Sequence, residues 1–258
     1  MNGNRQAGIR QGGFSLLEMM VVLLILGIVS AGLFVQINNA EQRAYSEQVK
    51  LDNFQEARDF VDQFFRDINE IGYPNSRMVD TTSLSWSPAL TTQAAYTWGN
   101  AYINDNRLAM GLVKIDANEI QFEGDINGNG TVQSMMYMIN GSGNCGLCLQ
   151  RSQVAKVSGN PLTGQTQNWG TETNDVISNP IFSYFQANGT QITSLPVDIS
   201  TSSGAQTIAS IKTIKISLVI RNNAVVDPKT GQPIETVLEG EVSLNNCSMA
   251  ASGQPMSC

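Results

Sequence analysis

The residues of this chain best suited to covalent chemistry are four cysteines, which form two groups: Cys145 with Cys148, and Cys247 with Cys258. In an oxidising compartment an even number of cysteines favours disulfides, and four cysteines allow three pairings. We favour Cys145–Cys148 and Cys247–Cys258 because each pair closes a short local loop. The second bridge would tether the end of the chain and contribute about 3 kcal/mol in the chain-entropy model.

The spacing Cys145-Gly-Leu-Cys148 is also that of a redox-active dithiol. Redox dithiols sit at the N-terminus of a helix in a βαβ unit, whereas the flanking residues here are strand-like and rich in glycine. A zinc site would need all four thiolates to converge from distant parts of the chain. Structural disulfides are therefore the favoured interpretation.

A second polar group, Asp125-Ile-Asn127-Gly-Asn129-Gly, matches the first half of a calcium-binding loop. In such a loop alternate oxygens converge on the ion because a glycine allows a sharp turn. The second half does not match, because Met136 stands where calcium loops have a bidentate glutamate. A hairpin turn explains the same residues, and we favour the turn over the calcium site. No other cofactor or metal is expected.

Composition narrows the classes of function. The chain contains no histidine, which removes the commonest general base and most zinc and iron sites. No nucleophile–base arrangement is visible among the other residues, so we do not expect an enzyme. The net charge of −7 disfavours nucleic acid as a partner, since phosphates are neutralised by Lys and Arg.

Glu18 is a single carboxylate near the start of an apolar run that extends to Val35. An ionised carboxylate inside a membrane costs roughly 2.5–3.5 kcal/mol, so it usually has a partner and a function. At headgroup level, beside the positive end of a helix, the cost is smaller. A basic leader without acidic residues ends at Gly12-Gly13, ahead of the apolar run. Secretory signals have their cleavage site after the apolar segment, so cleavage here would leave the helix on the protein.

The stretch Gly13-Phe-Ser-Leu-Leu-Glu18, with its apolar continuation, resembles the N-terminal cleavage and methylation signal of type IV pilins and of the pseudopilins of type II secretion. The resemblance covers Arg10 to about Val35. It implies that a prepilin peptidase cuts after Gly13 and methylates the amine of Phe14. It also implies that Glu18 meets the N-terminal amine of a neighbouring subunit during assembly.

The same resemblance implies a location and partners. The precursor would be a single-pass inner-membrane protein with its N-terminus in the cytoplasm and its head in the periplasm. It would later enter a pilus or pseudopilus at the cell surface. The implied partners are other major and minor pilins, the prepilin peptidase, the inner membrane and the inner-membrane assembly platform.

These site residues need a long helix to position them. We expect a leader over 1–13, a spanning helix over 14–37 and an amphipathic continuation over 38–72. The spanning part is long enough to cross a bilayer core of about 30 Å at 1.5 Å per residue. The continuation has apolar residues at alternating steps of three and four, which predicts a stripe buried against a domain. The residues of this stripe are Phe54, Ala57, Val61, Phe64, Ile68 and Ile71.

The rest of the chain predicts a β-rich head. Range 73–118 is expected to connect helix and sheet, and range 119–258 to form the head, with hairpin turns at Asn188-Gly189 and Asp227–Gly231. Stretches rich in β-branched residues are expected as strands: Glu119–Glu123, Thr131–Ile139, Ile181–Gln186, Ile208–Ile220 and Ile234–Leu244. The predicted fold class is α+β, a long N-terminal helix packed on a C-terminal antiparallel sheet, as in pilins.

Spacing and residue class from Phe122 to Asn246 are also similar to larger minor pilins of the PilW type and to pseudopilins of the GspJ type. Together the resemblances imply a structural subunit, a minor pilin that takes part in assembly of a type IV pilus. A pseudopilin of type II secretion is the alternative. A function of another class, an adhesin-like binding module at a filament tip, would use the segment Arg77–Asn118. The sequence leaves these alternatives open.

Overall fold

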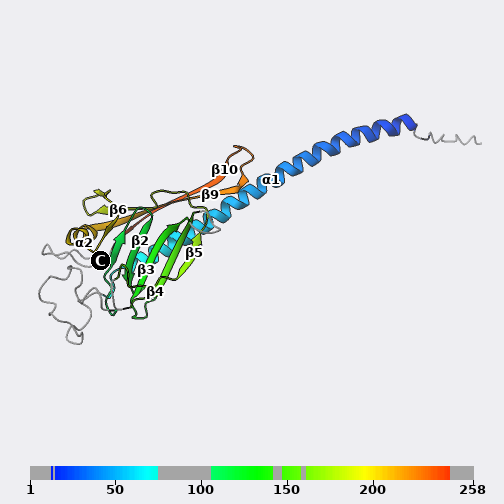
Figure 1. Cartoon of the computed structure of the whole chain (residues 1–258). Helices are drawn as coiled ribbons and strands as arrows, with labels where there is room; N and C mark the ends of the chain where they lie inside the picture. Colours follow the sequence, from blue (N-terminus) through cyan, green and yellow to red (C-terminus); the bar gives the residue numbers. More distant parts are fainter. Residues whose placement is uncertain (1–12, 14, 75–105, 142–146, 158–160, 245–258) are drawn as a thin grey trace, which may run out of the picture.

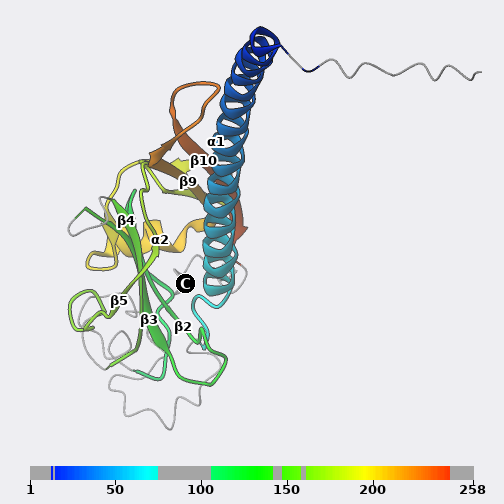
Figure 2. The same cartoon turned by 90° about the vertical axis from the view of Figure 1, so that its right-hand side faces the viewer.

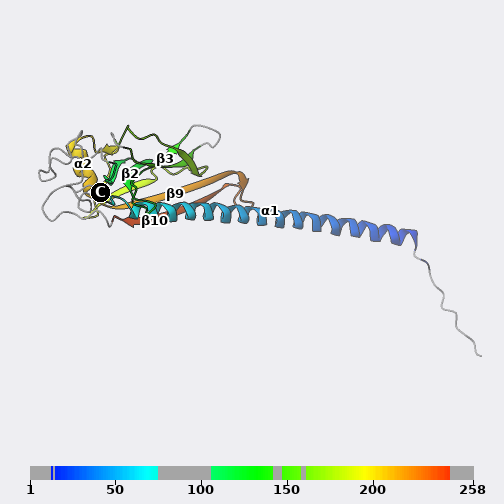
Figure 3. The same ribbon diagram turned by 90° about the horizontal axis from the view of Figure 1, so that it is seen from below.

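One helix, α1 (Leu16–Asn69), forms the spine of the molecule (Figure 1). Its 54 residues measure about 80 Å at 1.5 Å per residue. The first half projects away from the rest of the chain, and the second half lies along the head (Figures 1 and 3). The computed structural model describes residues 13, 15–74, 106–141, 147–157 and 161–244.

Within these residues the head contains two antiparallel sheets and a short helix, α2 (Ser202–Ala209). One sheet has the strand order β5-β4-β3-β2-β1-β8 and the other the order β10-β9-β6-β7. Figure 2 shows β9 and β10 lying against α1. The strands are β1 Leu112–Ile115, β2 Glu119–Gly124, β3 Gln133–Asn140, β4 Cys148–Ala155, β5 Trp169–Thr173, β6 Phe182–Gln186, β7 Gln191–Ile192, β8 Val197–Asp198, β9 Ile211–Val226 and β10 Pro233–Ser243. This layout confirms the predicted α+β class.

Among its apolar residues, the buried face of α1 differs from the predicted stripe by the exchange of one residue for another. Phe54 is 42% exposed, so its predicted burial is wrong, and Phe60 is buried in its place. The buried face also includes three polar residues, Ser46, Asn53 and Asp67, which an apolar pattern does not reveal. The other residues of the predicted stripe are buried: Ala57, Val61, Phe64, Ile68 and Ile71.

Gly240 on β10 marks a very close approach between α1 and the four-stranded sheet. A Cβ atom there would lie well inside van der Waals contact with the ring of Phe65. Next to this contact, Phe64 stacks on Phe182 and meets Tyr137 edge-on, both at 5.4 Å between ring centroids. A side chain at 240 would therefore require the Phe65 ring or the helix to shift.

All five predicted strands exist, with shifted ends. The largest shift is in β9, because residues 208 and 209 belong to α2 and the strand continues to Val226. Thr201 caps α2 by accepting a hydrogen bond from the amide of Gly204 at 3.0 Å. The prediction missed α2 and the strands β1, β4, β5, β7 and β8. Of these, β1 lies inside the range 73–118 that was expected to connect helix and sheet.

Both predicted hairpin turns are confirmed. Asn188-Gly189 joins β6 to β7, and Gly189 has a φ of 82°, which favours glycine. Asp227–Gly231 joins β9 to β10, where the amide of Gly231 donates to the carbonyl of Asp227 at 2.8 Å. The tip of this second hairpin reaches α1, because Lys50 Nζ lies 3.1 Å from Asp227 Oδ2.

Candidate functional site

The predicted processing and assembly residues lie at the free end of α1. Gly13 is exposed, and Phe14 lies outside the described residues. Glu18 is exposed in the first turn of the helix, where its amide donates to the carbonyl of Ser15 at 3.0 Å. A carboxylate in this turn lies near the positive end of the helix dipole. No described side chain pairs with Glu18.

Gly13 has no structural reason within the described residues to be glycine. A Cβ atom there would meet nothing within 4 Å, and its φ lies outside the left-handed region. The same open space surrounds Gly27 and Gly32 in the apolar half of α1. A side chain at any of these three positions would therefore meet no described residue of the same chain.

The first half of α1 carries a continuous apolar surface that no other described residue of the chain covers. The large apolar side chains from Leu16 to Ile37 are 51–79% exposed. An 18-residue window of this helix has a mean hydropathy of 2.6 and is 0% buried, so α1 is long and apolar enough to cross a membrane. Such a surface needs lipid or another protein to cover it.

The second half of α1 is fixed to the head by a buried polar cluster centred on Asp67, which is 1% exposed. Its Oδ2 accepts hydrogen bonds from the Tyr137 hydroxyl at 2.5 Å and from Arg151 Nε at 2.9 Å, and Oδ1 accepts from Gln63 Nε2 at 2.6 Å. Burial and the neighbouring Asp67 charge raise the pKa of Tyr137, which keeps its hydroxyl protonated as a donor. The cluster joins α1 to β3 and β4.

Sequence reasoning missed this cluster, because the predicted stripe contained apolar residues alone. The one available signal is spacing, since Asp67 continues the steps of three and four set by Ala57, Phe60 and Phe64. Arg151 gave no signal, because the strand that carries it was itself not predicted.

A second buried ion pair fixes the segment that follows residues 75–105. Lys156 Nζ lies 2.6 Å from Glu123 Oε2, and both side chains are 0% exposed. The same Nζ donates to the carbonyl of Leu108 at 2.9 Å, and the amide of Met110 donates to Glu123 Oε2 at 3.0 Å. Burial raises the pKa of the Glu123 carboxyl, against the opposing effects of Lys156 and Met110.

The predicted calcium ligands all accept hydrogen bonds from the protein. Asp125 receives the amides of Asn129 at 3.1 Å and Gly130 at 2.6 Å, one on each carboxylate oxygen. Oδ1 of Asn127 accepts from Gln153, and Oδ1 of Asn129 accepts from the amide of Thr131. The described residues contain no group of three or more acidic or cysteine side chains that could hold a metal. These contacts are those of a hydrogen-bonded hairpin turn between β2 and β3.

Of the four cysteines, Cys148 is the one within the described residues. It begins β4, is 0% exposed and is not a free thiol. Cys145, Cys247 and Cys258 lie outside the described residues, so the pairing stays a prediction. A strand start is also not the helix N-terminus at which redox dithiols sit.

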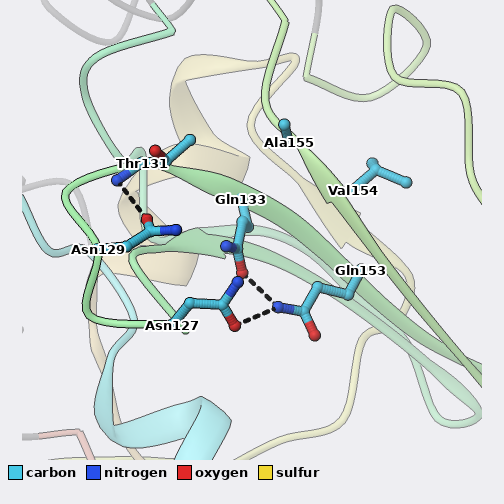
Figure 4. A pocket seen from close by; sticks show the side chains of 7 residues that line it. All are labelled: Asn127, Asn129, Thr131, Gln133, Gln153, Val154 and Ala155. Atoms are coloured by element: carbon cyan, nitrogen blue, oxygen red, sulfur yellow. Dashed lines mark hydrogen bonds between the residues drawn. The ribbon is translucent and has the colours of Figure 1, made fainter.

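An open pocket of about 520 Å³ lies where the β2–β3 turn meets the end of β4 (Figure 4). We call it the amide pocket. Its polar lining consists of side-chain amides and one hydroxyl, and sequence reasoning did not find it. The lining residues are Asn127, Asn129, Thr131, Gln133, Gln153, Val154 and Ala155.

Residues 9–34 match the family described as the prokaryotic N-terminal methylation motif. The matched stretch contains Gly13, Phe14 and Glu18 and most of the apolar half of α1. Comparisons with curated proteins and with solved structures found no match. The chain therefore carries the N-terminal signal of type IV pilins and pseudopilins, on a long helix joined to an antiparallel β-rich head of pilin layout.

Proposed function

We propose that this protein is a minor pilin, a structural subunit that takes part in assembly of a type IV pilus. One observation carries the proposal: the methylation motif lies on a helix whose apolar half is not covered by the described part of its own chain. A membrane covers that surface before assembly, and the helices of neighbouring subunits cover it in the filament core. The large head, with two sheets, supports a minor rather than a small major subunit.

In this proposal the peptidase cuts after Gly13 and methylates Phe14, and Glu18 then compensates the amine of Phe14 on an adjacent subunit. The pairing removes the cost of a carboxylate in an apolar surrounding. It also gives a register, because each carboxylate needs one amine. The absence of a described partner for Glu18 within its own chain supports this role.

Two alternatives follow from the same motif. A pseudopilin of type II secretion would use the helix and Glu18 in the same way, and neighbouring genes for a retraction motor or for secretion components would separate the two. An adhesin-like module at a filament tip would use Arg77–Asn118, of which residues 75–105 lie outside the described residues. Deleting that loop separates the adhesin, since adhesion would fall while filaments form normally.

The test replaces Glu18 by alanine, with Glu41→Ala as the control. Both glutamates are exposed on α1, but only Glu18 lies in the apolar segment. We expect Glu18→Ala to be processed and inserted in the membrane yet lost from sheared filaments, whereas Glu41→Ala is incorporated normally. Immunoblots of membrane and filament fractions measure both, and normal incorporation of Glu18→Ala would contradict the proposal.

A further inference from the structure

We propose that the amide pocket binds a neutral, hydroxyl-rich carbohydrate. The pocket lies beside the C-terminal end of α1, since the neighbouring Gly124 forms a β-bridge with Ile71 and the amide of Asp125 donates to the carbonyl of Tyr73 at 2.7 Å. This is the end of the spine remote from the apolar half. A ligand could therefore reach the pocket while the helix is held in a membrane or a filament.

The chemistry of the lining favours hydroxyl groups over ions. Four carboxamides and one threonine hydroxyl supply its polar side-chain atoms, and none of the described residues that line it is charged. Carboxamides both donate and accept hydrogen bonds, as sugar hydroxyls do. A phosphate, sulfate or carboxylate would find no opposite charge in the pocket and would meet a chain of net charge −7.

Groups that can only donate hydrogen bonds determine which way each side-chain amide is turned. Arg151 Nη2 donates to Gln153 Oε1 at 2.7 Å, and because arginine cannot accept, Gln153 must present its Nε2 as a donor. That nitrogen donates to Asn127 Oδ1 at 2.9 Å and also to Gln133 Oε1. The amide of Thr131 donates to Asn129 Oδ1 at 2.9 Å.

With their oxygens engaged in this way, the NH2 groups of Asn127, Asn129 and Gln133 have no partner among the described residues. Figure 4 shows these side chains gathered at the β2–β3 turn, with Gln153 reaching toward Asn127 and Gln133. The β2–β3 turn supplies two of these free donors, and the start of β3 supplies the third. Such a group of donors suits the hydroxyl oxygens along one edge of a saccharide.

Contacts with the rest of the protein restrict two of the side chains that line the pocket. Arg151, which orients Gln153, is itself held by an ion pair of 2.8 Å with the buried Asp67 of α1. Gln133 is only 5% exposed and therefore has little freedom. Such anchoring lowers the entropy lost when a ligand binds.

The experiment compares two matched variants of the full chain, kept in a zwitterionic detergent that has no sugar headgroup. Asn129→Asp keeps the acceptor oxygen for Thr131 but replaces the free NH2 group by an oxygen. Asn188→Asp makes the same change in the β6–β7 turn, where Asn188 also accepts an amide two residues later, at 2.9 Å, and also precedes a glycine of positive φ.

Binding is measured on an array of neutral glucose, galactose, mannose and N-acetylglucosamine oligosaccharides that also holds sialylated and sulfated ones. We expect the wild type to retain at least one neutral oligosaccharide, Asn188→Asp to bind it equally, and Asn129→Asp to bind it about tenfold more weakly or worse, the factor that corresponds to one lost hydrogen bond in a preformed site. Equal thermal unfolding midpoints check that both variants fold.

Several outcomes would overturn the proposal. These are retention of no neutral oligosaccharide, retention of anionic oligosaccharides alone, equal binding by Asn129→Asp, or binding that EDTA abolishes, since a metal would then do the recognising. If Asn129→Asp does not fold, Asn127→Asp takes its place, because Asn127 is exposed and its substitution leaves the Asn129–Thr131 contact intact. The test uses unassembled protein, so its result is independent of the role proposed for Glu18.

Discussion

Asp67 and Glu123 are both buried, but they differ in how many of their carboxylate oxygens accept hydrogen bonds. Asp67 has hydrogen-bond donors on both oxygens, whereas Glu123 Oε1 has no described partner. Glu123 therefore retains part of its desolvation cost, which explains the upward shift of its pKa. The ion pair with Lys156 and the hydrogen bond from the Met110 amide offset that cost. Removing either Glu123 or Lys156 leaves the other buried without its partner in the ion pair.

A double-mutant cycle at Glu123 and Lys156 tests this account. We expect Glu123→Leu and Lys156→Met each to lower the free energy of unfolding by about 3–5 kcal/mol, because each leaves a buried polar partner without its charge complement. Glu123→Leu/Lys156→Met should cost much less than the sum of the single changes. Chemical unfolding measures the three values, and additive losses would contradict the coupling.

The same pair predicts a dependence on pH. The folded-state pKa of Glu123 is raised above its unfolded value, so its contribution to stability is lost as pH rises from about 4.3 through the folded pKa. We expect the double variant, which lacks Glu123, to show a weaker dependence of the free energy of unfolding on pH over this range. An unchanged slope in the double variant would show that other groups cause it.

The β2–β3 turn gives a prediction about calcium. Asp125 already accepts two backbone amides, so we expect isothermal titration of calcium into the full chain to give no heat above buffer. Asp125→Asn should still destabilise the turn by about 1 kcal/mol, because a charged acceptor of two amides is replaced by a neutral one. Calcium heat that Asp125→Asn abolishes would establish the metal site instead.

At the scale of elements, the contact between α1 and β10 depends on Gly240. We expect Gly240→Ala to lower the free energy of unfolding by about 1–3 kcal/mol, because the added methyl overlaps the ring of Phe65. Gly170→Ala on β5 is the matched control, since its nearest neighbour would lie at an ordinary 3.8 Å. Thermal or chemical unfolding compares them, and equal effects would show that the helix can shift to accept the methyl.

The sequence was sufficient to predict the elements with a strong pattern and insufficient for those without one. The spine helix and five strands follow from apolar period and β-branched content. In contrast, β4 contains Gln150, Arg151 and Gln153, whose side chains are ordered by contacts with other elements. The terminal signal is a local motif and was readable, whereas Asp67 and the amide pocket arise where distant segments meet, which no local pattern encodes.

At the scale of the whole molecule, the pairing of the four cysteines is a prediction that can be tested directly. We expect non-reducing peptide mapping of exported protein to find Cys145 linked to Cys148 and Cys247 linked to Cys258. Reduction should then lower stability by about 3 kcal/mol for the second bridge alone. A peptide linking Cys145 to Cys247 would overturn this pairing.

The β9–β10 hairpin runs alongside the second half of α1, and Lys50 and Asp227 join its tip to the helix (Figure 3). A pull on the N-terminal half of α1 therefore loads the helix–hairpin contact in shear along its whole length and does not peel it from one end. We expect the head to withstand more force in this direction than across the sheets. Single-molecule pulling along the two directions measures the difference, and equal rupture forces would remove this mechanical advantage.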